Sequence, residues 1–221
     1  MAGVISLDVN MTEEYIAAAC KNNNVYITHI KSIGLNEAMD KEVKIDQVAK
    51  GFHSGSITVI DCAVQRPLIV TLSWEDSTIR IWNYYKNTCE QAKLFSGADD
   101  APLNKSTRPL LTVAIHPAGY YMAVGYLDRI RLFHILHNGT WFFRNIDIRN
   151  CSKIKFSTGG QWFAAADSKH LYLYNSYTLQ RIGSPEKLPS VNVSDLRFNA
   201  QDTCIAVSFS DGFIAWYETR G

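Results

Sequence analysis

The sequence predicts an all-β fold, a β-propeller with about five repeated units. The first support is a short run that alternates apolar residues, ends in an aromatic residue and recurs along the 221-residue chain. The run is "STIRIWN" at Trp82, "DRIRLFH" at Phe133, "KHLYLYN" at Tyr174 and "DGFIAWY" at Trp216, with a weaker version, "NNVYITH", that has Thr28 in the aromatic position. The steps between these residues are 54, 51, 41 and 42, and repeats of ~40–45 residues are typical of propellers.

The second support is the sequence before each run, where two β-rich segments flank a turn. In the third unit these segments are "LLTVAI" and "YYMAVGY", separated by "HPAG". Val, Ile, Phe and Tyr favour strands, and Pro, Gly, Asn and Asp accept turn geometries. Many segments are apolar without clean alternation, which is expected of strands buried on both faces. The predicted blades span residues 4–48, 56–95, 110–147, 151–183 and 193–218.

Each predicted blade except the last has a fourth, outer strand. These strands are expected at "EVKIDQV", "CEQAKLF", "WFFRNID" and "LQRIG", whereas the fifth unit has three strands. A closed ring usually has ~4–8 blades, each a four-stranded sheet. Seven blades of ~43 residues would need about 300 residues. We therefore expect a single propeller region over residues 1–221 that is part of a larger seven-bladed propeller. A five-bladed ring closed by the N-terminus is the alternative.

The second blade has an Asp six residues before a Trp, and a set of polar residues around them explains this spacing. His53 precedes the blade in "FHSGSI", and Ser73, Asp76 and Trp82 follow. These residues resemble the hydrogen-bonded His, Ser/Thr, Asp and Trp of the WD40 family, in which the Asp orients the His and the bonds reach the indole. A buried indole N–H and a buried carboxylate both need partners. Ser73 lies three residues before Asp76, where two is usual, so Thr71 is the alternative.

Composition and motifs point away from several other functions. The net charge of +1 gives no nucleic-acid footprint, and no apolar run approaches the ~20 residues of a membrane span. The five cysteines are scattered without a C-x-x-C pair, so neither a zinc site nor a disulfide framework is expected. "GFHSG" lacks the central Ser of a nucleophile elbow. We expect no catalytic residues, no metal and no cofactor.

Exposed loops on a rigid scaffold are the expected contact sites. The candidate residues occur in the turns of the second blade, in the acidic pair of "SGADDAPLNKSTR" and in the outer strand "WFFR". They are Arg66, Trp74, Glu75, Tyr84, Tyr85, Asp99, Asp100 and Trp141. The insertions 31–41 and 96–108 account for the longer repeat steps. Because per-repeat insertions commonly map to a binding face, at least one is expected to be ordered by a partner.

Residues 53–182 resemble one WD40 group in particular, the axonemal proteins of cilia and flagella. The resemblance rests on "HSGSIT", "RPLIVTLS" and "STIRIWNYYKNTCE", with "AIHPAGYYMAVGYLDRIRL" and "CSKIKFSTGGQWFAAA". It implies a non-catalytic scaffold in the cytoskeleton of motile cilia, with a coiled coil outside this segment. The implied partners are inner-arm dynein, regulatory-complex subunits and tubulin, with no nucleic acid and no membrane. The alternative is a WD40 adaptor that recognises a peptide in another cytosolic complex.

Overall fold

The computed structural model describes residues 3–10, 14–22, 24–32, 46–47, 53–94 and 110–219. The chain divides into two compact units, Met1–Ser96 and Gly97–Gly221. Apart from one short 3-10 helix, Ile30–Ser32, every regular element among the described residues is a β-strand. None of the described residues forms a helix long and apolar enough to cross a bilayer.

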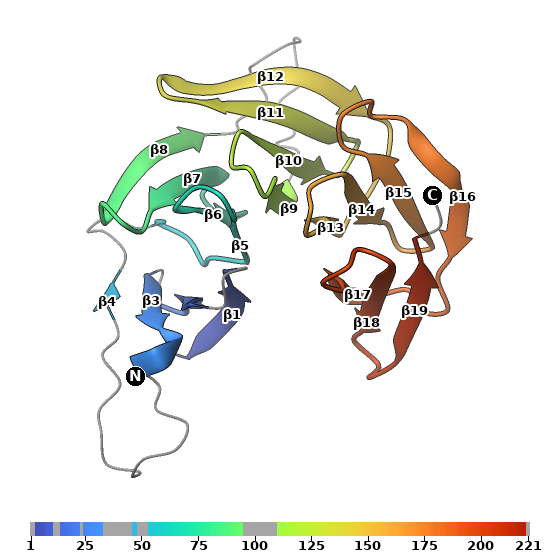
Figure 1. The fold of residues 1–221 in the computed structure, drawn as a ribbon, viewed down its shortest axis with the longest axis horizontal. Coiled ribbons are helices and arrows are strands. Elements are labelled where there is room, and N and C mark those ends of the chain that lie inside the picture. The colour runs from blue at the N-terminus through green and yellow to red at the C-terminus, as the bar shows by residue number, and fades with distance from the viewer. Residues whose placement is uncertain are drawn as a thin grey trace. The chain divides into compact units, whose positions relative to one another are not determined.

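The first unit contains two four-stranded antiparallel sheets, blue to green in Figure 1. In each sheet the strands lie side by side in chain order. The first sheet consists of β1 (Val4–Val9), β2 (Tyr15–Cys20), β3 (Val25–His29) and β4 (Asp46–Gln47). The second consists of β5 (Val59–Cys62), β6 (Leu68–Ser73), β7 (Thr78–Asn83) and β8 (Thr88–Leu94). Strands β1 and β2 contact β5, so the two sheets pack on each other.

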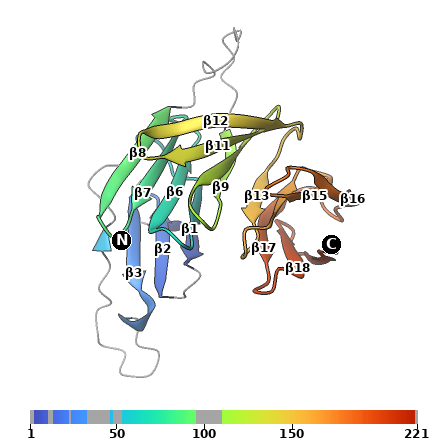
Figure 2. The ribbon, with the colours of Figure 1, turned by 45° about the horizontal axis from the view of Figure 1, so that its top comes forward.

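The second unit contains three antiparallel sheets, again with the strands in chain order. The third sheet has β9 (Leu110–Ile115), β10 (Tyr121–Tyr126), β11 (Ile130–Leu136) and β12 (Gly139–Ile146). The fourth has β13 (Lys153–Phe156), β14 (Trp162–Ala166), β15 (His170–Asn175) and β16 (Arg181–Lys187), and the fifth has β17 (Val193–Phe198), β18 (Cys204–Phe209) and β19 (Ile214–Glu218). Strand β13 contacts both β9 and β17, and Figure 2 shows β13 beside β17.

The burial of each strand follows its place in its sheet. Every residue of β6 is buried, as expected for a strand covered on both faces. The outer strand β8 instead alternates exposed and half-buried residues. Apolar side chains from neighbouring sheets meet in shared clusters. Ile57, Ile69 and Trp82 pack with Ala17 and Ala19 in the first unit, and Leu171, Leu196 and Ile205 belong to a cluster shared by the fourth and fifth sheets.

Two turns hold neighbouring sheets of the second unit together. His116, after β9, contacts the Gly160 carbonyl oxygen through Nε2 at 2.9 Å, and burial lowers the pKa of this imidazole. A side chain at Gly160 would collide with that ring, and its φ of +76° also favours glycine. In the next pair of sheets, the Asp202 carboxylate accepts the N–H groups of Thr158 and Gly159, both at 2.7 Å.

The all-β fold with five blade-like sheets agrees with the fold class predicted from the sequence. Two details differ. The fourth outer strand is β16, Arg181–Lys187, so it continues beyond "LQRIG". In the fifth sheet the core position is filled by Tyr217, which pairs with Ile205 as Trp82 pairs with Ile69. Trp216 therefore points to the other face and is 71% exposed. Of the predicted strand "EVKIDQV", only Asp46–Gln47 lies within the described residues.

Candidate functional site

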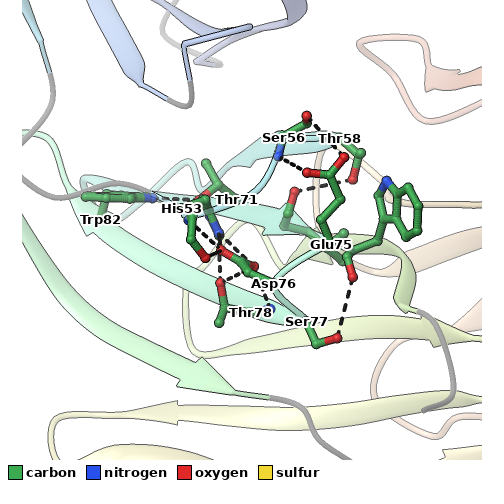
Figure 3. Close-up of polar contacts among 12 residues, drawn as sticks. His53, Ser56, Thr58, Thr71, Glu75, Asp76, Ser77, Thr78 and Trp82 are labelled. Atoms are coloured by element: carbon green, nitrogen blue, oxygen red, sulfur yellow. Dashed lines mark hydrogen bonds and ion pairs between the residues drawn. The ribbon is translucent and has the colours of Figure 1, made fainter. Parts of the chain in front are cut away.

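A buried chain of hydrogen bonds links the indole of the second sheet to the β6–β7 turn (Figure 3). The Trp82 N–H donates to Thr71 Oγ1 at 2.7 Å, and Thr71 Oγ1 lies 2.8 Å from His53 Nε2. On the other side of the ring, Nδ1 lies 2.8 Å from Thr78 Oγ1 and 3.2 Å from the Asp76 carboxylate. Trp82 is 1% exposed. The network thus satisfies the one polar atom of a large buried side chain.

The direction of the hydrogen bonds determines where the His53 ring carries its proton. An ionised carboxylate can only accept, so the ring hydrogen of a neutral His53 is assigned to Nδ1, which faces Asp76 and Thr78. The other ring nitrogen, Nε2, then accepts from the Thr71 hydroxyl, which itself accepts the indole N–H. Burial lowers the pKa of His53, although Asp76 acts to raise it. Because the net effect lowers the pKa of His53 below 6.5, the imidazole is neutral at neutral pH and its contact with Asp76 is a hydrogen bond.

Asp76 organises the turn between β6 and β7. Its carboxylate accepts the Thr78 N–H at 3.0 Å, the Thr78 hydroxyl at 2.6 Å and the Ser54 N–H at 2.9 Å. Burial acts to raise the pKa of Asp76, but the hydrogen bonds from Thr78 and Ser54, together with His53, hold it below its ordinary value. The turn itself places Ser77 at a φ of 53°. Asp76 therefore ties the turn to the segment that enters the sheet.

Ser73 does not take part in the network, and the assignment of Ser73 to the polar set is wrong. Its hydroxyl oxygen is buried without a hydrogen-bond partner among the described residues, whereas Thr71 makes both contacts. Register is the reason. Ile69 lies opposite Trp82, so Thr71 is two residues from the indole and Ser73 is four. At ~3.3 Å per residue, Ser73 lies too far along β6 to reach it.

The connectivity of Thr71, His53 and Asp76 is that of a Ser-His-Asp triad, in which a hydroxyl contacts one ring nitrogen and a carboxylate the other. Its surroundings prevent such chemistry. Thr71 is 0% exposed, and one of its lone pairs is occupied by the Trp82 N–H. No group of three or more His, Cys, Asp or Glu that could hold a metal ion occurs in the described part of the chain. The arrangement can hold a turn and an indole in place, but it cannot bring a substrate to a nucleophile.

Trp74 and Glu75 lie in the same turn, where the Glu75 side chain is hydrogen-bonded and the Trp74 side chain is exposed. The Glu75 carboxylate accepts the Ser56 N–H at 2.8 Å and the Ser56 hydroxyl at 3.3 Å. A side chain on Gly55 would collide with Glu75, so glycine is needed for this close approach. Trp74 is 52% exposed. The turn therefore presents a large aromatic surface on a well-anchored backbone.

The opposite end of the second sheet carries an aromatic row. The Tyr84 ring stacks on Tyr85 with centroids 5.5 Å apart and lies 5.7 Å from Tyr15, which in turn contacts His29 at 4.8 Å. Burial raises the pKa of Tyr84, while Tyr85 is 73% exposed. Arg66, in the β5–β6 turn at the same end of the strands, is half-buried. The row of contacting rings thus ends in one accessible ring, that of Tyr85.

Of the remaining predicted contact residues, the structure describes Trp141. Trp141, in β12 of the second unit, is 58% exposed and pairs across the strand with His134. Asp99 and Asp100, the 96–108 insertion and most of the 31–41 insertion lie outside the described residues.

Sequence reasoning missed one surface feature, a cleft beside β19. Its volume is about 460 Å³. It is lined by parts of β15, β16, β18 and β19: Leu171, Leu173, Ile182, Gly183, Ser184, Glu186, Ile205, Trp216, Tyr217 and Glu218. The alternation of "FIAWYE" could have shown that two adjacent aromatics must face opposite ways. It could not show which of them faces the core.

Comparisons with known proteins agree with this picture. No family model matches the sequence. The chain is 29% identical to cilia- and flagella-associated protein 57 of Mus musculus over 96% of its length, and 28% identical to cilia- and flagella-associated protein 57 A of Tetrahymena thermophila over 84%. It spans 16% and 13% of these two relatives, so it corresponds to about a sixth of their length or less. The predicted resemblance to ciliary and flagellar proteins is confirmed.

The structure is also similar to the β-propeller domain of Cps50 (Swd1) from Myceliophteria thermophila, with a TM-score of 0.75 at 14% identity. The match covers 100% of this chain and 67% of that one. At this identity the likeness concerns the fold alone, and it confirms the predicted propeller class.

Proposed function

We propose that the chain is a non-catalytic propeller module of the ciliary axoneme that holds partner proteins in place. The observation that carries the proposal is the sequence similarity to cilia- and flagella-associated proteins over 96% of the chain. The expected role is to help position inner dynein arms or regulatory complexes on doublet microtubules, with dynein, regulatory-complex subunits or tubulin as partners.

The local chemistry of the described residues supports a scaffold rather than an enzyme. The most complete polar constellation, His53 with Asp76 and Thr71, is closed off by Trp82. Exposed aromatic residues instead stand at both ends of the second sheet, at Trp74 and Tyr85. Tyr, Trp and Arg are the side chains most often found at the energetic centre of protein interfaces. Rigid turns that present such residues are suited to binding other proteins.

A co-sedimentation experiment tests this function. Purified chain is incubated with demembranated axonemes from which its counterpart has been removed, and the pelleted fraction and its crosslinked neighbours are identified. We expect saturable binding and crosslinks to dynein, regulatory-complex or tubulin subunits. Trp74→Ala and Tyr85→Ala should weaken binding with an unchanged melting temperature, and Lys86→Ala is the exposed control next to Tyr85. Failure to bind axonemes, with capture by a non-ciliary cytosolic complex, would favour the adaptor alternative.

A further inference from the structure

A row of aromatic rings begins on the outer hairpin of the third sheet. Trp141 of β12 is 58% exposed and lies opposite His134 of β11, so the two side chains are neighbours on one face of the sheet. The His134 ring stacks on Phe143 with centroids 4.2 Å apart, and Phe143 meets the ring of Tyr121, in β10, edge-to-face at 6.3 Å. Aromatic rings from three adjacent strands are therefore contiguous.

The row continues onto the fourth sheet, whose strand β13 contacts β9 and β10 (Figure 1). The Tyr121 ring stacks on His116 at 4.1 Å, and the His116 ring lies 6.1 Å from that of Tyr177, in the β15–β16 turn. Tyr177 is 67% exposed, so both ends of the row are accessible. Six rings form what we call the aromatic band: Trp141, His134, Phe143, Tyr121, His116 and Tyr177.

The middle of the band is held by the core beneath it. Tyr121 and Phe143 pack against the apolar cluster that the third and fourth sheets share, and the contact of His116 with the Gly160 carbonyl joins the turns of the two sheets. The exposed ends are thus attached to a packed base. Exposed apolar surface that is contiguous and bordered by polar residues marks sites of protein interaction.

The segments that contribute the band contain no carboxylate. These segments are residues 116–121, 134–144 and 174–181. Besides tyrosines, their ionisable side chains are His116, His134, His137, Arg144 and Arg181. Both arginines are exposed, and neither has a carboxylate partner among the described residues. The band is therefore bordered by unneutralised positive charge.

Two carboxylates from other segments do not reverse this balance. Asp202, from the fifth sheet, already accepts two backbone N–H groups of the β13–β14 turn. Asp147 follows β12 at the far end of the third sheet. Burial raises the pKa of Tyr174, and Arg181 acts to lower it while Asp147 acts to raise it, so Arg181 lies close enough to offset that acid. An acidic occupant is favoured beside the band, and a basic one is repelled.

We propose that the aromatic band binds an acidic segment of a partner protein. An apolar or aromatic residue of the segment packs on the exposed rings of Trp141 or Tyr177, and its Asp or Glu side chains pair with Arg144 and Arg181. Trp, Tyr and Arg are the residues that most often dominate protein interfaces. A nucleic acid is also acidic, but it requires a basic stripe or a high pI, which a net charge of +1 does not indicate.

The inference rests on the proposed binding function and names a partner chemistry for it. It uses other residues than Trp74 and Tyr85, and its test contains no axoneme. A chain that binds axonemes but no acidic peptide would contradict this inference alone, and the reverse result would contradict the ciliary function alone.

Fluorescence anisotropy with the 221-residue chain tests the proposal. The probe is a labelled, end-blocked decapeptide of glutamates with phenylalanine at its fourth and seventh positions. Replacement of every glutamate by glutamine should weaken binding about fivefold to tenfold. Replacement of both phenylalanines by serine should weaken it to a similar degree, by about tenfold. Binding of the glutamate peptide should also fall as salt is raised from about 0.05 M to 0.5 M, because salt screens exposed charges.

Matched protein variants locate the binding surface. Arg144→Gln combined with Arg181→Gln should weaken binding about fivefold, whereas Arg149→Gln, an exposed arginine beyond the far end of β12, should not. Trp141→Ala should weaken binding at least about threefold, and Trp216→Ala is the control at an exposed tryptophan of the fifth sheet. Unchanged melting temperatures would show that all these variants are folded.

Several results would overturn the proposal. They are the absence of acidic-peptide binding, equal binding of the glutamine peptide, and equal affinity of the Trp141→Ala and Trp216→Ala variants. Tighter binding of an oligothymidylate with the same number of negative charges, lost in the same variants, would assign the band to a nucleic acid instead. Self-association of the chain that Trp141→Ala abolishes would assign it to a second copy.

Discussion

The turns that follow β6 and β14 are built around the same residue type but support different cores. Asp76 accepts the N–H of the residue two positions on, Thr78, at 3.0 Å, and Asp167 accepts that of Lys169 at 2.6 Å. From there the two turns diverge. Asp76 reaches the indole of Trp82 through His53 and Thr71, whereas Asp167 accepts the Tyr172 hydroxyl at 2.9 Å.

This difference shows that the Asp turn needs only residues close to it in the sequence, whereas the buried indole needs hydrogen-bond partners from distant parts of the chain. An Asp can organise its own turn through nearby backbone N–H groups in either sheet. A fully buried Trp needs a partner for its N–H, and β6 alone cannot supply a complete chain of donors and acceptors. His53, which enters from before the sheet, completes it. In the fourth sheet the corresponding position holds Tyr174, which is half-buried and stacks on Phe163 with centroids 5.2 Å apart.

The largest expected effect is at the indole. Trp82→Ala should lower the free energy of unfolding by about 3–5 kcal/mol, because it removes a large side chain from a packed site. Tyr174→Ala should cost less, since its ring is only half-buried. Urea denaturation followed by circular dichroism measures both, and Trp74→Ala is the exposed Trp control. Equal losses for Trp82→Ala and Trp74→Ala would contradict the central place of Trp82.

The second-largest expected effect is the difference in stability loss between substitutions of Asp76 and Asp167. Asp76→Ala should cost about 1–3 kcal/mol, because it removes the acceptor of the Ser54 N–H, the Thr78 N–H and the Thr78 hydroxyl. Asp167→Ala should cost less, because His170 and Lys169 around its turn are closer to solvent. Thermal and urea melts of the two variants provide the comparison. A larger loss for Asp167→Ala would show that the turn, and not its link to the indole, determines the stability.

A smaller loss of stability should distinguish substitution of Thr71 from substitution of Ser73. Thr71→Val keeps the shape of the side chain but leaves the Trp82 N–H and His53 Nε2 without their shared hydroxyl, for about 1–2 kcal/mol. Ser73→Ala should be close to neutral, because its hydroxyl has no hydrogen-bond partner among the described residues. Denaturation midpoints of these variants, measured together, decide between the two residues. Should Ser73→Ala be the more damaging change, the hydrogen-bond assignment would have to be reversed.

Much of the difference between the two sheets could be predicted from the sequence. The sequence-based predictions that were wrong have physical causes. The repeat of strand-forming segments is local, so it predicts five sheets. The set of His53, Asp76 and Trp82 is what the resemblance to the WD40 family implies. The choice between Thr71 and Ser73 depends on the register between β6 and β7, which a single strand does not encode. Which of Trp216 and Tyr217 faces the core also depends on the register between strands, because a shift of one residue exchanges the two faces of a strand.

The smallest predicted effect concerns pH and involves both units. The pKa values of His53 and His116 are lowered from the ordinary 6.5, mainly by burial. Each histidine is therefore neutral in the folded chain and more readily protonated in the unfolded one. Their contribution to stability is fully present above about pH 6.5 and is lost as the pH falls through the folded pKa values.

Urea midpoints measured between pH 7.5 and pH 5 should therefore decline toward acid. The pKa of Asp76 is lowered from 3.8, so its own contribution is lost only at lower pH and does not obscure this window. His53→Gln and His116→Gln should each be less stable at pH 7.5 but show a shallower decline, and the transitions that they alter should belong to different units. Parallel curves for the parent and both variants would mean that other groups cause the acid sensitivity. A flattened curve for His53→Gln alone would place the sensitivity in the network that distinguishes the second sheet from the fourth.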